Sequence, residues 1–185
     1  MKIKSLISVS FVLLICLSCA KKISKTESRN SQVAYNELKA LVNSKSYSFN
    51  ARSANPMQSN ETIEVNNYLL SRTDNTGLRQ DLSTNKSFIS IKNDSIIGDL
   101  AYFGELRTSS YNDAGNMNIK FKGMPYQYET IINDRANEIT VKFKIKGDSE
   151  DFNVIMVVFP NKNAKVSIYS SNRTAIQYLG EVLPI

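Results

Sequence analysis

The stretch ITVKFKIKGDSEDFNVIMVVF, residues 139–159, decides the fold class. In its first half apolar residues alternate with Thr or Lys, the pattern of a β-strand with one face toward solvent. Residues 152–159 are apolar on both faces except at Asn153, which predicts a central strand covered on both sides. The polar residues 147–151 lie between the two halves and predict a hairpin loop. This segment therefore predicts an antiparallel β-hairpin.

Short strand patterns continue on both sides of this hairpin. Tyr47, Phe49 and Ala51 alternate with polar neighbours. Turn-forming Asn, Asp, Pro and Ser residues separate the remaining runs. We predict further strands at 63–65, 88–91, 117–122, 126–132, 165–169 and 175–182.

One amphipathic helix is predicted ahead of the strands. Its apolar residues recur at i, i+4, i+7 and i+8, and they are Ala34, Leu38, Leu41 and Val42. Asn30 or Ser31 can cap its first turn. Short strands joined by short turns favour an antiparallel meander. We therefore expect a mainly β, α+β fold: an antiparallel, strongly curved sheet or open barrel with one N-terminal helix packed on it.

The first residues resemble a bacterial lipoprotein signal peptide. Lys2 and Lys4 precede the apolar segment 6–17, and a small residue, Ser18, directly precedes Cys19. As a helix the apolar segment would span about 18 Å, well short of a hydrocarbon core of about 30 Å. The resemblance implies that residues 1–18 are removed and that Cys19 carries the lipid, which would anchor the chain to a membrane.

The residues after Cys19 suggest where the chain is placed. Ala20 resembles the pattern of lipoproteins sent to the outer membrane, and Lys21 and Lys22 stand where surface-exported lipoproteins of Bacteroidetes tend to carry acidic residues. We expect a lipid-anchored outer-membrane protein that faces the periplasm. The alternative is an ordinary secretory signal cut near Ala20. Residues 19–30 are predicted to be a flexible tether, and residues 31–185 a single β-rich domain.

The composition excludes several kinds of chemistry. The chain has no histidine, and without residues 1–18 its only cysteine is Cys19. Ser-His-Asp and Cys-His catalysis and the common zinc sites are therefore not available. The net charge of +6 is spread along the chain, so we do not expect a nucleic-acid partner. We predict no catalytic residue, no metal site and no cofactor.

Carboxylate chemistry remains as an alternative, because a glycan hydrolase needs only two suitably spaced acids. The available acids show no spacing that selects a pair; they are Glu61, Glu64, Asp99, Glu105 and Glu129.

Two charged stretches of the sequence can each be interpreted in two ways. Asp148, Glu150 and Asp151 form either a solvated acidic loop or oxygen ligands for calcium, although they lack the EF-hand spacing. The lysines at 142, 144 and 146 either keep a sheet face soluble or attract an anionic surface.

Aromatic residues supply the candidate binding site. Tyr102, Tyr126 and Tyr128, together with Arg173, could line a groove for a peptide or a small apolar ligand, because tyrosine offers apolar area and a hydroxyl group. The alternative is that these rings fill the core. Arg173 could also hold a carboxylate such as Asp99.

Several segments resemble one known family. They are GDLAYFG at 98–104, YNDAGN at 111–116, IKF at 119–121 and SNRTAIQYLG at 171–180. These segments are similar to the signature of an uncharacterised Bacteroidetes lipoprotein family, the domain of unknown function numbered four-two-five-one. Ala101 replaces the family's proline, and Glu105 stands where a basic residue is common. The resemblance implies a lipoprotein with a β-rich fold and no assigned activity.

These observations lead to one expected function and two alternatives. We expect a non-enzymatic envelope lipoprotein that contacts the membrane through Cys19 and binds an envelope protein or a small apolar ligand. The alternatives are a structural envelope lipoprotein and a carboxylate-dependent glycan hydrolase.

Overall fold

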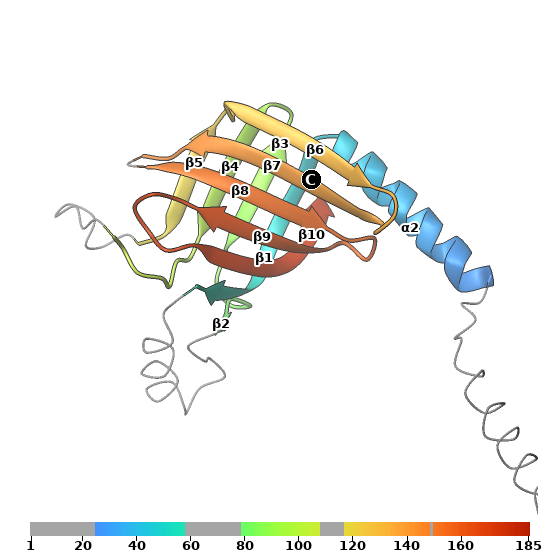
Figure 1. The fold of residues 1–185 in the computed structure, drawn as a ribbon, viewed down its shortest axis with the longest axis horizontal. Helices are drawn as coiled ribbons and strands as arrows, with labels where there is room; N and C mark the ends of the chain where they lie inside the picture. The colour runs from blue at the N-terminus through green and yellow to red at the C-terminus, as the bar shows by residue number, and fades with distance from the viewer. Residues whose placement is uncertain (1–24, 58–78, 108–116, 149) are drawn as a thin grey trace, which may run out of the picture. The chain divides into compact units, whose positions relative to one another are not determined.

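The computed structural model describes residues 25–57, 79–107, 117–148 and 150–185. The described chain begins with one helix, α2 (Lys25–Asn43), and continues in strands (Figure 1). The strands are β1 (Ser46–Pro56), β2 (Gln80–Asp81), β3 (Phe88–Lys92), β4 (Ser95–Leu100), β5 (Ile119–Gly123), β6 (Gln127–Asn133), β7 (Glu138–Lys146), β8 (Asp151–Val158), β9 (Asn163–Tyr169) and β10 (Ile176–Pro184).

All these strands belong to one antiparallel sheet. Its order is β5-β4-β3-β1-β10-β9-β8-β7-β6, and β2 pairs with β1 outside this path. The sheet curls so strongly that β6 to β10 cross in front of β3 to β5 in Figure 1, which makes it a half-barrel with its core on the inner face. The predicted mainly β fold with a strongly curved antiparallel sheet is confirmed.

The hairpin formed by β7 and β8 shows how the sequence pattern becomes the core. The strands pair from Ile139↔Val158 to Lys146↔Asp151. The alternate residues Ile139, Val141, Phe143 and Ile145 are buried on the inner face, and the lysines between them point outward. On β8 the residues Phe152, Val154, Met156 and Val158 are buried in the same way. Apolar alternation has therefore set which face of the hairpin packs inward.

The prediction that β8 is covered on both sides is wrong. The strand is central, because it pairs with β7 and with β9. However, Asn153, Ile155 and Val157 are only partly buried on its outer face. A curled sheet encloses its core on the concave side only, and no described element packs over this part of the convex side.

Helix α2 packs on the sheet through its C-terminal half, as predicted. Tyr35, Leu38 and Val42 are buried in the core. The start of the helix differs from the prediction, because Asn30 and Ser31 lie inside α2 and do not cap it. The segment KTESRN contains neither Gly nor Pro, so nothing in it ends a helix. The part of the predicted tether that precedes Lys25 lies outside the described residues.

No helix among the described residues is long and apolar enough to span a membrane.

Two features of the sheet were not predicted, and one prediction cannot be compared. β2 and β4 were missed. In β4 the sequence SIIGDL has Gly98 in its centre, and glycine weakens a strand pattern. The structure explains this glycine, because a side chain there would collide with the ring of Phe121 on β5. The strand predicted at 63–65 lies outside the described residues.

β1 and β10 approach each other closely at a second glycine, Gly180. The register of the pair shifts between Ala51 and Ser53, which marks a β-bulge. A Cβ atom at Gly180 would collide with the carbonyl oxygen of Asn50 and would lie 2.9 Å from Cα of Ala51. Backbone atoms cannot turn aside as a flexible side chain can, so only glycine fits there.

We expect Gly180→Ala to lower the free energy of unfolding by about 1–3 kcal/mol, the usual cost of overpacking. Urea denaturation of the purified protein measures this change. Leu179→Ala is the control, because the neighbouring Leu179 is 38% exposed. Equal stability of the two variants would contradict the close approach of β1 and β10.

Candidate functional site

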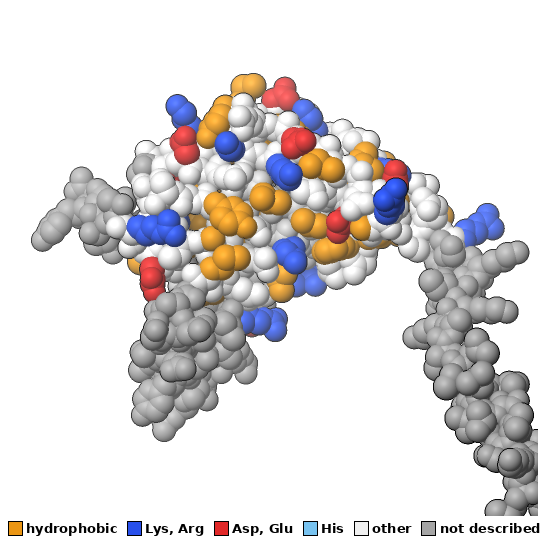
Figure 2. All heavy atoms as spheres, in the orientation of Figure 1, with side chains coloured by type: hydrophobic (Ala, Val, Ile, Leu, Met, Phe, Trp, Pro, Cys, Tyr) orange, Lys and Arg blue, Asp and Glu red, His pale blue; other side chains and the backbone are white. Residues whose placement is uncertain are grey.

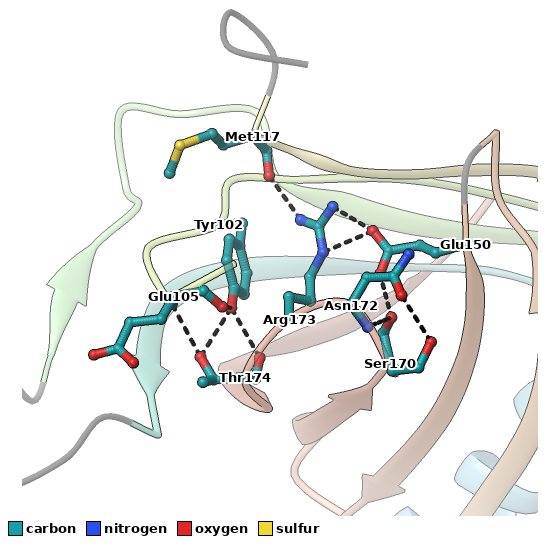
Figure 3. Close-up of polar contacts among 9 residues, drawn as sticks. Tyr102, Glu105, Met117, Glu150, Ser170, Asn172, Arg173 and Thr174 are labelled. Atoms are coloured by element: carbon teal, nitrogen blue, oxygen red, sulfur yellow. Dashed lines mark hydrogen bonds and ion pairs between the residues drawn. The ribbon is translucent and has the colours of Figure 1, made fainter. Parts of the chain in front are cut away.

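Two segments far apart in the sequence meet where β4 leaves the sheet and β10 enters it. Leu106 and Arg173 form an antiparallel bridge. The backbone amide of Arg107 donates to the carbonyl oxygen of Asn172 at 2.8 Å. The backbone amide of Thr174 donates to the carbonyl oxygen of Glu105 at 2.9 Å. The contacts around this junction form the Arg173 cluster (Figure 3), which comprises Tyr102, Glu105, Met117, Glu150, Ser170, Arg173 and Thr174.

Arg173 lies at the centre of this cluster. Its Nε donates to Oε1 of Glu150 at 2.8 Å, Nη2 donates to the same oxygen, and Nη1 donates to the Met117 carbonyl oxygen at 2.9 Å. The hydroxyl of Ser170 donates to the other oxygen of Glu150. The side chains of Arg173 and Glu150 are only 10% and 3% exposed. This is a buried ion pair in which both charged groups have hydrogen-bond partners.

Two predictions about these charges are therefore wrong. Arg173 does not hold Asp99, which instead accepts a hydrogen bond from Asn118 at 3.0 Å and lies 3.9 Å from the ammonium group of Lys120. Glu150 does not belong to a solvated loop, because the β7–β8 turn directs its carboxylate toward Arg173. The described residues contain no group of acids, cysteines or histidines able to hold a metal ion.

Tyr102 connects the same two segments from the other side of the arginine. Its ring lies against the guanidinium, 4.7 Å from ring centroid to Cζ of Arg173. Its hydroxyl lies 2.9 Å from the Glu105 carbonyl oxygen and 3.0 Å from that of Thr174. Burial raises the pKa of the Tyr102 hydroxyl, although the hydrogen bonds to Thr174 and the charge of Arg173 oppose this rise. The hydroxyl therefore stays protonated and can donate a hydrogen bond to either of these carbonyl oxygens.

The other two predicted tyrosines lie on or beside β6, away from this cluster. The ring of Tyr128 stacks on Phe143, with centroids 6.4 Å apart, and Nζ of Lys45 lies 5.3 Å from its centroid. Tyr126 is 52% exposed, and its hydroxyl lies 3.4 Å from Oδ2 of Asp151. The structure thus brings Tyr102 and Arg173 together and leaves Tyr126 and Tyr128 elsewhere. Ligand binding by these residues stays a prediction.

The geometry of the Arg173 cluster favours a structural role. The charged groups of Arg173 and Glu150 and the hydroxyl of Tyr102 are bonded within the cluster. Figure 3 shows the Glu105 side chain pointing away from the arginine. Of the acids considered for glycan hydrolysis, Asp99 and Glu129 lie on strands near opposite edges of the sheet, and both point outward. Glu61 and Glu64 lie outside the described residues.

The segments that form the cluster fall within a region that matches a known family. Residues 29–182 match a family model described as Domain of unknown function (DUF4251). The chain belongs to the DUF4251 family. A crystal structure of a DUF4251 family protein from Bacteroides eggerthii DSM 20697 has the same fold, with a TM-score of 0.55 and 16% sequence identity. The match covers 82% of this chain and 88% of that one.

No curated protein matches the DUF4251 chain. The family description states no activity, so the comparisons support the fold and leave the function open. The family resemblance rested in part on the segments 98–104 and 171–180, and the structure shows these segments in contact. Tyr102 comes from the first segment, and Arg173 and Thr174 come from the second.

A second candidate site, which the sequence did not suggest, lies on the outer face of the sheet. We call it the outer patch, and its residues are Ile131, Ile155, Val157, Tyr169 and Leu179. The strand register places Ile131, Thr140, Val157, Lys165 and Leu179 in one row across β6 to β10. Figure 2 shows hydrophobic side chains gathered on this face among lysine and arginine side chains.

Basic side chains surround the outer patch. A depression of about 310 Å³ next to Leu179 is lined by Arg52, Arg79, Lys165 and Phe159, among others. A second depression of about 410 Å³ is lined by Lys142 and Lys144 and reaches Glu129 on β6. The outer patch thus combines exposed apolar side chains with a polar, mostly basic rim. The sequence pattern did not indicate this patch, because it predicted that β8 is covered on both faces.

We expect Glu150→Leu to lower the free energy of unfolding by about 3–5 kcal/mol, because it leaves the charge of Arg173 buried without a partner. The double variant Glu150→Leu with Arg173→Met should regain most of this loss, since apolar replacements of a buried pair are often tolerated. Urea denaturation measures both changes.

The matched control is the exposed ion pair of Lys45 and Asp94, whose side chains are 45% and 71% exposed. Asp94→Asn should cost less than about 1 kcal/mol. A Glu150→Leu variant as stable as Asp94→Asn would show that the Arg173 cluster does not hold the sheet together.

Proposed function

We propose that this DUF4251 chain is a non-enzymatic, lipid-anchored envelope protein that binds another envelope protein through the outer patch. The exposure of the patch is the observation that carries the proposal. Ile131, Tyr169 and Leu179 are 37%, 40% and 38% exposed, and they surround the half-buried Ile155 and Val157. Clustered apolar side chains with a polar rim are typical of protein interaction surfaces.

The packing of the inner face favours a protein partner over a small apolar ligand. Side chains that point inward from the central strands are nearly all buried in one core, which also includes Tyr35, Leu38 and Val42 of α2. A small ligand usually occupies a concave, mostly apolar pocket. The outer face instead offers a broad surface, which suits a protein better than a small molecule.

The charge of the rim indicates the chemistry of the partner. Lys142 and Lys144 point outward beside the patch, and Lys165 lies within it, between Val157 and Leu179. Glu129 opposes Lys142 across β6 and β7. A partner with apolar side chains at the centre of its surface and carboxylates around them would match both features. Charge complementarity of this kind raises the association rate and the specificity of a complex.

The lipid anchor is supported by the sequence pattern that ends at Cys19, which lies outside the described residues. In this proposal the processed chain is attached through Cys19 to the outer membrane and faces the periplasm. The attachment would concentrate the domain at the membrane surface, so that even a weak interface could find its partner there.

We expect Cys19→Ala to release the chain from membranes or to leave its signal peptide uncleaved, because the lipid has no other attachment point. Membrane fractionation with immunoblotting measures this effect, and Cys16→Ala serves as the control that should remain attached. Normal processing and membrane retention of Cys19→Ala would rule out the lipid anchor.

We expect Leu179→Lys to weaken partner capture about tenfold or more, which corresponds to about 1.4 kcal/mol, because it would bury an unpaired ammonium group in the interface. The measurement is quantitative cross-linking in intact cells followed by purification of the tagged chain. Ile97→Lys is the matched control, because Ile97 is also 38% exposed but lies on β4, outside the patch. Equal capture by both variants would exclude the outer patch as the binding surface.

A further inference from the structure

The two edges of the sheet differ in how far they are protected from further strand pairing. β5 is one terminal strand and β6 is the other. An unprotected edge strand offers its backbone groups to an additional strand, and proteins usually prevent this with lysines, prolines, bulges or a covering segment. The comparison of the two edges therefore shows where an additional strand can pair.

The β5 edge carries several such protections. Lys120 and Lys122 are two of its five residues, and Gly123 ends the strand with a φ of +151°, a conformation that favours glycine. Phe121 also forms a bridge with Gly147, so the β7–β8 turn covers part of this edge. Another strand could not pair along the full length of β5.

The β6 edge carries fewer of these protections, although Nζ of Lys45 lies 5.3 Å from the ring centroid of Tyr128. Its sequence QYETIIN contains no Lys, Arg or Pro, and Glu129 is its only charged residue. It is the most exposed long strand of the sheet, with Ile131 and Ile132 exposed by 37% and 44%. Among the described strands only β7 pairs with it, and β6 forms the upper margin of the sheet in Figure 1.

The sequence of β6 is complementary to itself in the antiparallel direction. With a two-fold axis at Thr130, residue 130 faces its own copy, Tyr128 faces Ile132, Glu129 faces Ile131 and Gln127 faces Asn133. All seven residues of the strand then have a partner. Aromatic with β-branched pairs and Thr with Thr pairs are among the favourable cross-strand contacts, and no like charges face each other.

The neighbouring strand β7 fits the same arrangement. On the outer face Glu129 lies between Lys142 of its own chain and Ile131 of the second copy. The next row carries Lys144 at one end and Glu138 of the second copy at the other end. The row of Gln127 and Asn133 thus ends in opposite charges, and the row of Glu129 ends in Lys142 and in Thr140 of the second copy. The inner face joins Tyr128, Thr130 and Ile132 of both copies.

The registers with the axis at Glu129, Tyr128 or Ile132 are less favourable. An axis at Glu129 would place two carboxylates directly opposite each other, which destabilises a strand pair. An axis at Tyr128 would place Ile131 opposite Pro125, which has no amide hydrogen to donate. An axis at Ile132 would leave Gln127 without a partner and would bring Asp134 opposite Thr130.

We propose that two copies of this chain associate by antiparallel pairing of β6 with β6, with the two-fold axis at Thr130. The pairing converts the two half-barrels into one continuous sheet and is an isologous interface. It goes beyond the proposed function and does not depend on the lipid anchor or on a partner at the outer patch.

The proposal is tested by disulfide cross-linking of the full chain, purified from membranes in detergent. Directly opposed residues of antiparallel strands have Cα atoms about 4.5–5.5 Å apart, within the range that a disulfide spans. Thr130→Cys should therefore form a disulfide-linked dimer under mild oxidation. Lys122→Cys, on the protected β5 edge, is the matched control, and the unsubstituted chain gives the background from Cys16 and Cys19.

The association without a covalent link is measured by light scattering of the same preparations, corrected for detergent. The unsubstituted chain should have the mass of a dimer. Thr130→Lys should have the mass of a monomer, because two ammonium groups would meet at the axis, and Ser95→Lys on β4 should remain dimeric. Circular dichroism checks that each variant is folded.

Two results would overturn the proposal. One is that Thr130→Cys gives no more dimer than Lys122→Cys. The other is that the unsubstituted chain is monomeric, in which case the β6 edge is left for an extended segment of a different protein. Loss of the dimer in Thr130→Lys alone, with a cross-link in Thr130→Cys, supports pairing at the predicted register.

Discussion

The buried ion pair of Arg173 and Glu150 joins parts of the chain that the strand ladder alone would leave apart. Arg173 precedes β10, Glu150 lies in the turn before β8, and the Met117 carbonyl group that Arg173 also contacts precedes β5. In the strand order only β9 separates β8 from β10, whereas β5 is a terminal strand, and the three elements meet at one end of the curled sheet. Because both charges are removed from water, the pair stabilises the fold only while both partners are present.

The curl that this end contact supports gives the sheet two different faces. The inner face is filled by the apolar core and by the C-terminal half of α2, and the Tyr178 hydroxyl donates to the Ala101 carbonyl oxygen at 2.9 Å. The outer face and the β6 edge remain available. The proposed binding through the outer patch and the proposed pairing through β6 share Ile131, whereas the other residues of the patch lie on β8, β9 and β10.

The strands with regular alternation were predictable, and the contacts between distant elements were not. β7 was recognised because one face of an amphipathic strand repeats with period two. β4 was missed because Gly98 interrupts its pattern, and the reason for this glycine, the ring of Phe121, comes from another strand. The acids of the β7–β8 turn have the same chemistry, so the sequence could not show which of them pairs with Arg173. Only the fold shows that the partner is Glu150.

The sequence alone was sufficient for the mainly β class, the N-terminal helix, the family resemblance and the absence of histidine, because each of these depends on local pattern or composition. The tertiary structure was needed to show that Tyr102 and Arg173 meet while Tyr126 and Tyr128 lie elsewhere. It was also needed to show that Ile155 and Val157 reach the surface, because exposure depends on which face the curled sheet turns toward its core. Local pattern defines a strand, whereas curvature and strand order decide which side chains a partner can reach.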